Sequence, residues 1–299
     1  EASGQGEKWA KLKKDNGDRA LEILMDRLAK ALETHGTVQV LRQGFSIAGC
    51  GHIDLSEAAP EDKRNADVLK RYAANILRVV PQLQYHPSRK LAIDLVLFIN
   101  GIPVATVELK TDFTQSAEAA MDQYRTDRLP YDTKTKRREP LLTFKRGAVV
   151  HFAMSDSEIQ MATKLDGDNT VFLPFNKGNN NGAGNPPNPS GIKTDYLWKE
   201  ILTKNNLTDI VQNFCQLITE EKEYLDEKGK IKTRKEKKLI FPRYHQLLAV
   251  RNLLADAQEK GSGQKYLVQH SAGSGKSNSI SWLAHQLVGL HDKSGKDNI

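Results

Sequence analysis

One stretch in the first half of the chain decides the fold, because two apolar runs meet there at a tight-turn dipeptide. It reads Leu91-Ala92-Ile93-Asp94-Leu95-Val96-Leu97-Phe98-Ile99-Asn100-Gly101-Ile102-Pro103-Val104-Ala105-Thr106-Val107-Glu108-Leu109-Lys110. Apolar runs on both sides of Asn-Gly are typical of two antiparallel strands joined by a hairpin turn. The pattern therefore predicts strands over 91–99 and 102–110.

Polar side chains interrupt both predicted strands. Side chains alternate between faces, so Glu108 and Lys110 share one face of the second strand. Asp94 stands among apolar residues of the first strand, where a carboxylate is costly unless it is paired or binds a metal. The hairpin would make Asp94 and Glu108 near-opposite neighbours that jointly hold Mg²⁺, with Lys110 orienting water or stabilising charge on a phosphate. The alternative is a structural Asp94–Lys110 ion pair at the strand end.

Other elements are expected around this hairpin. Apolar spacing predicts helices over 18–35, 65–79, 116–125, 195–203, 207–219, 243–258 and 276–289, and strands over 147–154, 158–164, 170–174 and 265–269, with 82–86 extended. Asn, Gly and Pro dominate 177–191, which indicates a long loop or linker. Residues 220–238 are a charge run that we expect to be solvated and partly mobile.

Composition narrows the class of protein. Lys and Arg number 44 against 37 Asp and Glu, a net charge of +7 over 299 residues that favours an anionic partner, nucleic acid first. No apolar run approaches a membrane span, and no secretory signal opens the sequence. Two cysteines exclude a disulfide framework, so a reducing cytoplasm is the expected location.

The hairpin resembles a known nuclease core. Ile93-Asp94 with Val107-Glu108-Leu109-Lys110 is similar to the PD-(D/E)xK motif, and the stretch 93–110, with 122–125 and 145–152, resembles the N-terminal nuclease domain of type I restriction enzyme R subunits. The resemblance implies that Asp94 and Glu108 ligate the metal and that Lys110 assists phosphodiester hydrolysis. It also implies a role for Gln123 in the following helix. The family's Tyr four residues later is replaced by Asp127, so that role is not carried over.

A phosphate loop is predicted near the end of the sequence. Residues 271–277, Ser-Ala-Gly-Ser-Gly-Lys-Ser, lie between a predicted strand and a predicted helix. The glycines, Gly273 and Gly275, let backbone N–H groups approach phosphates, Lys276 would reach the β and γ oxygens, and Ser277 would touch Mg²⁺. The strict pattern has Gly where His270 stands, and the loop resembles helicase motif I. A Gly/Ser-rich turn before a helix is the alternative.

A second nucleotide motif precedes the loop. Residues 241–246, Phe-Pro-Arg-Tyr-His-Gln, resemble the Q motif of superfamily 2 helicases, in which Gln246 would read the adenine edge and Arg243 may flank the base. Only 22 residues follow Ser277, so the Walker B strand and the second motor lobe have no room. We therefore expect a fragment that binds ATP without ATPase activity.

Together these patterns predict an α/β protein: a PD-(D/E)xK mixed sheet flanked by helices, followed by the beginning of a RecA-like helicase lobe. The expected domains are a nuclease over 1–176, a linker with helices and a charged segment over 177–238, and the truncated lobe over 239–299. The resemblance implies a Mg²⁺-dependent, ATP-dependent type I site-specific deoxyribonuclease that acts on double-stranded DNA with modification and specificity subunits. The alternative is a basic DNA-binding or scaffolding module with an inactive nuclease core.

Overall fold

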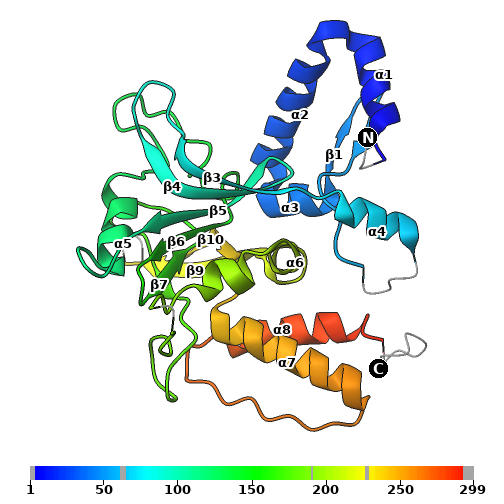
Figure 1. The fold of residues 1–299 in the computed structure, drawn as a ribbon. Coiled ribbons are helices and arrows are strands. Elements are labelled where there is room, and N and C mark those ends of the chain that lie inside the picture. Colours follow the sequence, from blue (N-terminus) through cyan, green and yellow to red (C-terminus); the bar gives the residue numbers. More distant parts are fainter. Residues whose placement is uncertain (1–3, 61–64, 190, 226–228, 292–299) are drawn as a thin grey trace.

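The centre of the molecule is one mixed six-stranded sheet (Figure 1), seen in a computed structural model that describes residues 4–60, 65–189, 191–225 and 229–291. Its strands follow one another in space in chain order. They are β3 (Leu77–Gln84), β4 (Ala92–Ile99), β5 (Ile102–Leu109), β6 (Val150–Met154), β7 (Ile159–Ala162) and β8 (Leu173–Pro174). All neighbours are antiparallel except β5 and β6, which are parallel. The predicted mixed sheet with flanking helices is confirmed.

The predicted hairpin forms β4 and β5. Asn100 and Gly101 connect them with φ angles of +50° and +85°, the left-handed conformation that a two-residue hairpin turn requires. The register pairs Leu95 with Val107, so Asp94 and Glu108 follow as the next opposing pair. Helix α5 (Ala117–Thr126), which matches the helix predicted over 116–125, then crosses the sheet. It returns the chain to β6, which runs parallel to β5.

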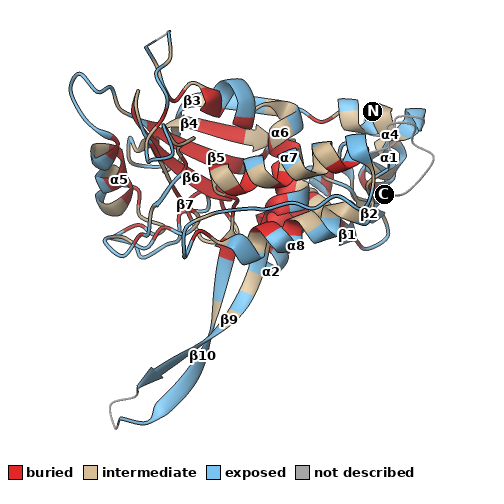
Figure 2. Cartoon of the chain, turned by 90° about the horizontal axis from the view of Figure 1, so that it is seen from below, coloured by how far each residue is buried: buried red, intermediate tan, exposed pale blue. Residues whose placement is uncertain are grey.

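The two faces of the sheet bury different partners. One face packs against α5, where Val96, Ala120, Met121, Tyr124 and Ala153 form an apolar cluster. The opposite face contributes Leu97, Val107 and Phe152 to the larger core. That core extends to helix α3 (Thr37–Gln43) and to both C-terminal helices (Figure 2). The candidate carboxylates therefore lie on the α5 face, where the smaller cluster leaves room for polar groups.

The N-terminal part is a helical lobe with one short β-hairpin. Its elements are α1 (Gly6–Asn16), η1 (Gly17–Arg19), α2 (Ala20–His35), α3 (Thr37–Gln43), β1 (Phe45–Ile47), β2 (Gly51–Ile53) and α4 (Ala66–Ala73). The predicted helix over 65–79 is too long. It ends at Ala73, and β3 takes residues 77–84 because they pair with β4 on both sides of Gln82. Asn65 caps α4 as predicted, by accepting from the Asp67 and Val68 amides.

The charged segment over 220–238 is largely exposed, as the sequence predicts, and most of its described residues form strands. The predicted helices over 195–203 and 207–219 correspond to η2 (Leu197–Ile201), α6 (Lys204–Asp209) and η3 (Ile210–Phe214), but residues 216–219 belong to a strand instead. The chain then forms a two-stranded ribbon of β9 (Gln216–Leu225) and β10 (Ile231–Ile240), which projects from the body in Figure 2. Ion pairs such as Lys222–Glu236 at 2.8 Å connect the two strands. The charged side chains that the sequence predicts to be solvated thus also link the ribbon.

Two helices complete the described chain, α7 (Tyr244–Lys260) and α8 (Lys276–Leu287). Both pack below the sheet in Figure 1, and Leu247, Val250 and Trp282 join the main core. The predicted strand over 265–269 is wrong: these residues are exposed and pair with no strand in the described chain. No helix among the described residues is long and apolar enough to cross a membrane.

Candidate active site

Asp94 and Glu108 meet on the α5 face of the sheet, as the sequence predicts. Asp94 is half-buried on β4, whereas Glu108 on β5 is 0% exposed. Burial raises the pKa of Glu108 to about 7, against the opposing effect of Arg128, and the nearby Asp94 carboxylate adds to the rise. Two adjacent acids in a desolvated place disfavour joint ionisation, and a bound cation would relieve both costs.

Glu108 has one satisfied and one orphaned oxygen. Its Oε1 accepts from Arg128 Nε at 2.6 Å, in an ion pair in which the Arg128 side chain is 10% exposed. Its Oε2 is buried and accepts no hydrogen bond from any donor among the described residues, with the Asp94 carboxylate beside it. An unpaired carboxylate oxygen is costly inside a protein, so this atom, with Asp94 beside it, fits the oxygen donor set that Mg²⁺ prefers.

Asp94 is oriented from two sides. Its Oδ2 accepts from the Leu109 amide at 2.8 Å, and its Oδ1 accepts from Gln82 Nε2 at 2.9 Å. Gln82 comes from β3 and has a φ of +48°, which is uncommon for a residue with a side chain. These contacts fix the carboxylate while each oxygen keeps a second lone pair for another partner.

Lys110 and Gln123 also come together. Lys110 follows the end of β5, and its Nζ donates to Gln123 Oε1 on α5 at 2.7 Å. None of the ion pairs among the described residues joins Lys110 to Asp94 or Glu108, so the alternative of an Asp94–Lys110 ion pair is not what holds this strand end. The ammonium lies at the same end of β5 as the acids and is half-buried.

A hydrogen-bonded network of uncharged side chains lies next to Glu108 on the α5 face of the sheet. Thr106 Oγ1, one step along the same face from Glu108, lies 2.8 Å from both Tyr124 Oη and His151 Nδ1. All three side chains are buried, and burial lowers the pKa of His151 to about 3. His151 is therefore neutral at pH 7 and acts as a packed hydrogen-bonding residue.

The basic segment after α5 divides into exposed and structural cations. Lys134, Lys136 and Arg137 are exposed. Arg138 and Arg146 instead pair with Glu33 at 2.7 and 3.2 Å. Lys145 is also structural, because its Nζ donates to the Thr34 carbonyl at the end of α2. Only the first group takes part in no ion pair among the described residues.

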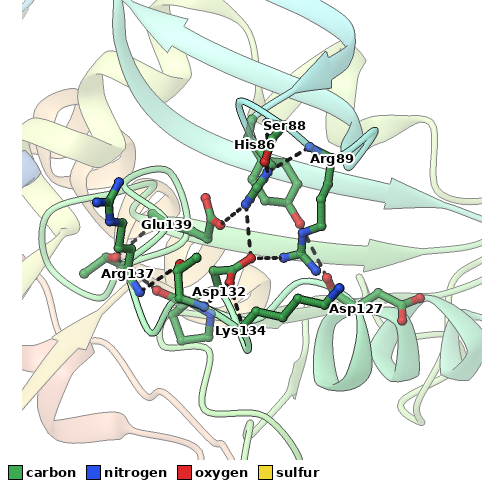
Figure 3. Close-up of polar contacts among 12 residues, drawn as sticks. His86, Ser88, Arg89, Asp127, Asp132, Lys134, Arg137 and Glu139 are labelled. Atoms are coloured by element: carbon green, nitrogen blue, oxygen red, sulfur yellow. Dashed lines mark hydrogen bonds and ion pairs between the residues drawn. The ribbon is translucent and has the colours of Figure 1, made fainter.

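A second cluster has the residue types of a metal site (Figure 3). His86, Asp132 and Glu139 offer three ligand atoms within 4.8 Å of one another. Its hydrogen bonds have another explanation. His86 Nδ1 accepts from the Ser88 and Arg89 amides, so Nε2 carries the hydrogen and points it at Asp132 (3.1 Å) and Glu139 (3.5 Å).

Arg89 completes that cluster as a counter-ion. Its guanidinium lies 2.6 Å from Asp132 Oδ2. The Thr135 and Lys134 amides, together with Arg89, hold the pKa of Asp132 at about 2. The cluster therefore ties the β3–β4 turn to the segment after α5, and a metal on Nε2 would require the opposite histidine tautomer.

The predicted nucleotide residues also meet. Gln246 on α7 accepts from the Arg243 amide at 2.9 Å and donates to the Gly275 carbonyl at 2.8 Å. Gly273 and Gly275 have φ angles of +72° and +82°, and a Cβ at Gly275 would collide with the Gln246 amide. Lys276 and Ser277 begin α8 and are exposed, and Lys276 Nζ donates to the His270 and Ser271 carbonyls.

Two residues of the acid site escape the sequence pattern. Arg128 lies just past the end of α5, and no periodicity or motif marks it. Gln82 lies in a segment expected only to be extended. A buried Glu needs a cation or a metal, so a basic partner for Glu108 could have been expected. The sequence contains many arginines, however, and does not show which of them lies near Glu108.

A mixed sheet with a crossover helix over paired acids is a nuclease-type α/β fold. The chain belongs to the family described as "Type I restriction enzyme R protein N terminus", whose profile matches residues 3–170. A Methanocaldococcus jannaschii protein described as "Putative type I restriction enzyme MjaVIIIP endonuclease subunit" is 26% identical over 234 residues, which cover 72% of this chain. The chain spans only 19% of the length of that relative.

Proposed function

We propose that this chain carries the DNA-cleaving site of a type I restriction R subunit, with Asp94, Glu108, Lys110 and Gln123 as its working residues. The observation that carries the proposal is the buried, unpartnered Oε2 of Glu108 beside Asp94. Asp94 and Glu108 would hold Mg²⁺, which supplies a Lewis acid at the scissile phosphate and an activated water.

The protein's own groups then have distinct tasks. Gln82 and the Leu109 amide fix Asp94, so its carboxylate needs no reorganisation when DNA arrives. The Lys110 ammonium, held by Gln123, is available to stabilise negative charge that develops on the phosphate. The exposed Lys134, Lys136 and Arg137 are suited to contact backbone phosphates without reading sequence.

The C-terminal helices support a nucleotide site in the same protein. The contact of Gln246 with Gly275 joins the Q-motif residues to the phosphate loop, where Arg243, Gly273, Lys276 and Ser277 would bind ATP with Mg²⁺. In the full-length protein we expect this loop to belong to the beginning of a RecA-like lobe that drives translocation of duplex DNA. The proposed partners are DNA and the modification and specificity subunits, in the cytoplasm, where DNA and ATP are available.

Plasmid cleavage tests the nuclease. Wild type should nick supercoiled DNA with Mg²⁺ or Mn²⁺ and stop when EDTA is added. Asp94→Asn and Glu108→Gln should each lower the rate at least 100-fold, since each replaces a charged carboxylate ligand by a neutral amide. The matched control is Asp112→Asn, an exposed acid just beyond Lys110. DNA binding without any metal-dependent cleavage would favour a scaffold with an inactive core.

A further inference from the structure

Arg128 is the one cation that touches a proposed metal ligand among the described residues. It follows α5, and its amide donates to the Gln123 carbonyl at 3.0 Å. Its Nε lies 2.6 Å from Glu108 Oε1, and the two side chains are 10% and 0% exposed. Removing one partner of a buried ion pair destabilises a protein, because the other charge is left without compensation. Arg128 therefore affects the state of Glu108 directly.

The pair decides which Glu108 oxygen is available. Arg128 occupies Oε1, and Oε2 has no partner. A metal cation that binds between Asp94 and Glu108 therefore finds Oε2 of Glu108 available, and it need not displace Arg128 from Oε1. Partners that hold the outer side of a metal ligand fix its orientation, and their loss typically weakens metal binding about 10- to 100-fold.

Arg128 is itself held in place. The Tyr85 hydroxyl lies beside its guanidinium and donates to the Asp127 carbonyl at 3.4 Å. Four residues further on, Asp132 is bound by His86 and Arg89 from the β3–β4 turn, as Figure 3 shows. The segment that carries Arg128 is thus fixed on both sides of it, which suits a stationary group better than one that swings away.

Resting on the proposed nuclease function, we propose that Arg128 is a positioning residue that stays on Glu108 Oε1 and presents Oε2 to the metal. The competing role, a mere counter-charge that the metal must overcome, predicts the opposite sign. Removing a positive charge beside a divalent cation strengthens binding, whereas losing the orientation of a ligand weakens it. The two roles can therefore be separated by metal affinity alone.

The experiment is Mn²⁺ binding to the whole chain by calorimetry and by the loss of the free-Mn²⁺ electron paramagnetic resonance signal. Arg128→Lys keeps the charge and loses the fixed Nε donor, while Arg128→Gln loses the charge and keeps an N–H donor. If Arg128 positions Glu108, both variants bind Mn²⁺ about 10- to 100-fold more weakly than wild type. Circular dichroism confirms that each variant is folded.

Arg125 provides the matched control, because it lies in the last turn of α5, three residues before Arg128, and pairs only with Glu118 and Asp122 in the ion pairs of the described chain. Arg125→Lys and Arg125→Gln should leave Mn²⁺ affinity unchanged. Unchanged affinity in Arg128→Lys together with tighter binding in Arg128→Gln would overturn the positioning role, while Mn²⁺ binding that Asp94→Asn abolishes would still uphold the metal site. Absence of Mn²⁺ binding in wild type would contradict both.

Discussion

The ammonium of Lys110 lies 2.7 Å from the amide oxygen of Gln123, so the strand that carries Glu108 and the helix that crosses the sheet are joined close to the proposed metal ligands. Lys110 comes from the residue after β5, and Gln123 comes from the middle of α5. The hydrogen bond holds the flexible Lys110 side chain in one orientation.

Gln123→Ala should therefore lower the cleavage rate by up to about 100-fold while leaving Mn²⁺ affinity unchanged. Misplacement of a catalytic group by about 1 Å is enough for a loss of that size, and no metal ligand is removed. Gln115→Ala, an exposed glutamine before α5, is the control. An equal loss of Mn²⁺ affinity in Gln123→Ala would show that Gln123 belongs to the metal site instead.

Acid should destabilise the folded chain partly through His151. Burial lowers the pKa of His151 from 6.5 to about 3, so between these values the unfolded chain binds the extra proton. The free energy of unfolding then falls with decreasing pH, by up to about 1.4 kcal/mol per unit from this residue. His151→Gln should lose less stability than wild type between about pH 6.5 and 4 in urea titrations.

The exposed His35 gives the control for that series, because His35→Gln should follow the wild-type pH dependence. Parallel curves for wild type and His151→Gln over the whole range would mean that His151 is not held neutral by the fold. The comparison uses differences between variants, since Glu108, with its raised pKa, changes stability in the opposite direction as pH rises.

Nucleotide binding should depend on Lys276. The proposed phosphate loop places Gly273 and Gly275 at the N-terminus of α8, and Lys276 is its charged residue. Lys276→Ala should weaken ATP binding at least tenfold in equilibrium dialysis, with Lys265→Ala, an exposed lysine upstream, unchanged. Equal affinity in wild type and Lys276→Ala would remove the loop assignment.

DNA binding should depend steeply on salt and little on sequence. Each of Lys134 and Lys136 that meets a phosphate contributes about one unit to the slope of log K against log salt. Lys136→Ala should lower that slope by about one and weaken binding to all duplexes alike. Arg138→Ala should have a smaller effect, since Arg138 is paired with Glu33. A wild-type affinity that is flat across salt would exclude the electrostatic account.

Local signals explain what the sequence predicts well. Asn100-Gly101 fixes the hairpin and hence the register, and the register alone brings Asp94 to Glu108. Such features depend on residues near in the chain, so pattern and spacing are sufficient.

Features that depend on distant partners escape the pattern. Strands β9 and β10 carry charges on both faces, a pattern that the sequence alone assigns to a solvated run, and cross-strand pairs such as Lys222–Glu236 form only in the folded chain. The apolar run 265–269 resembles a buried strand, but no strand of the described chain pairs with it. Arg128 reaches Glu108 across 20 residues, and only the folded chain selects it.

The central claim is that Asp94 and Glu108 hold the metal, and anomalous scattering from crystals soaked in Mn²⁺ tests it most directly. The account predicts one peak bound by an oxygen of Asp94 and by Oε2 of Glu108, at about 2.0–2.2 Å, with Arg128 still on Oε1. A peak among His86, Asp132 and Glu139, with none between Asp94 and Glu108, would contradict it.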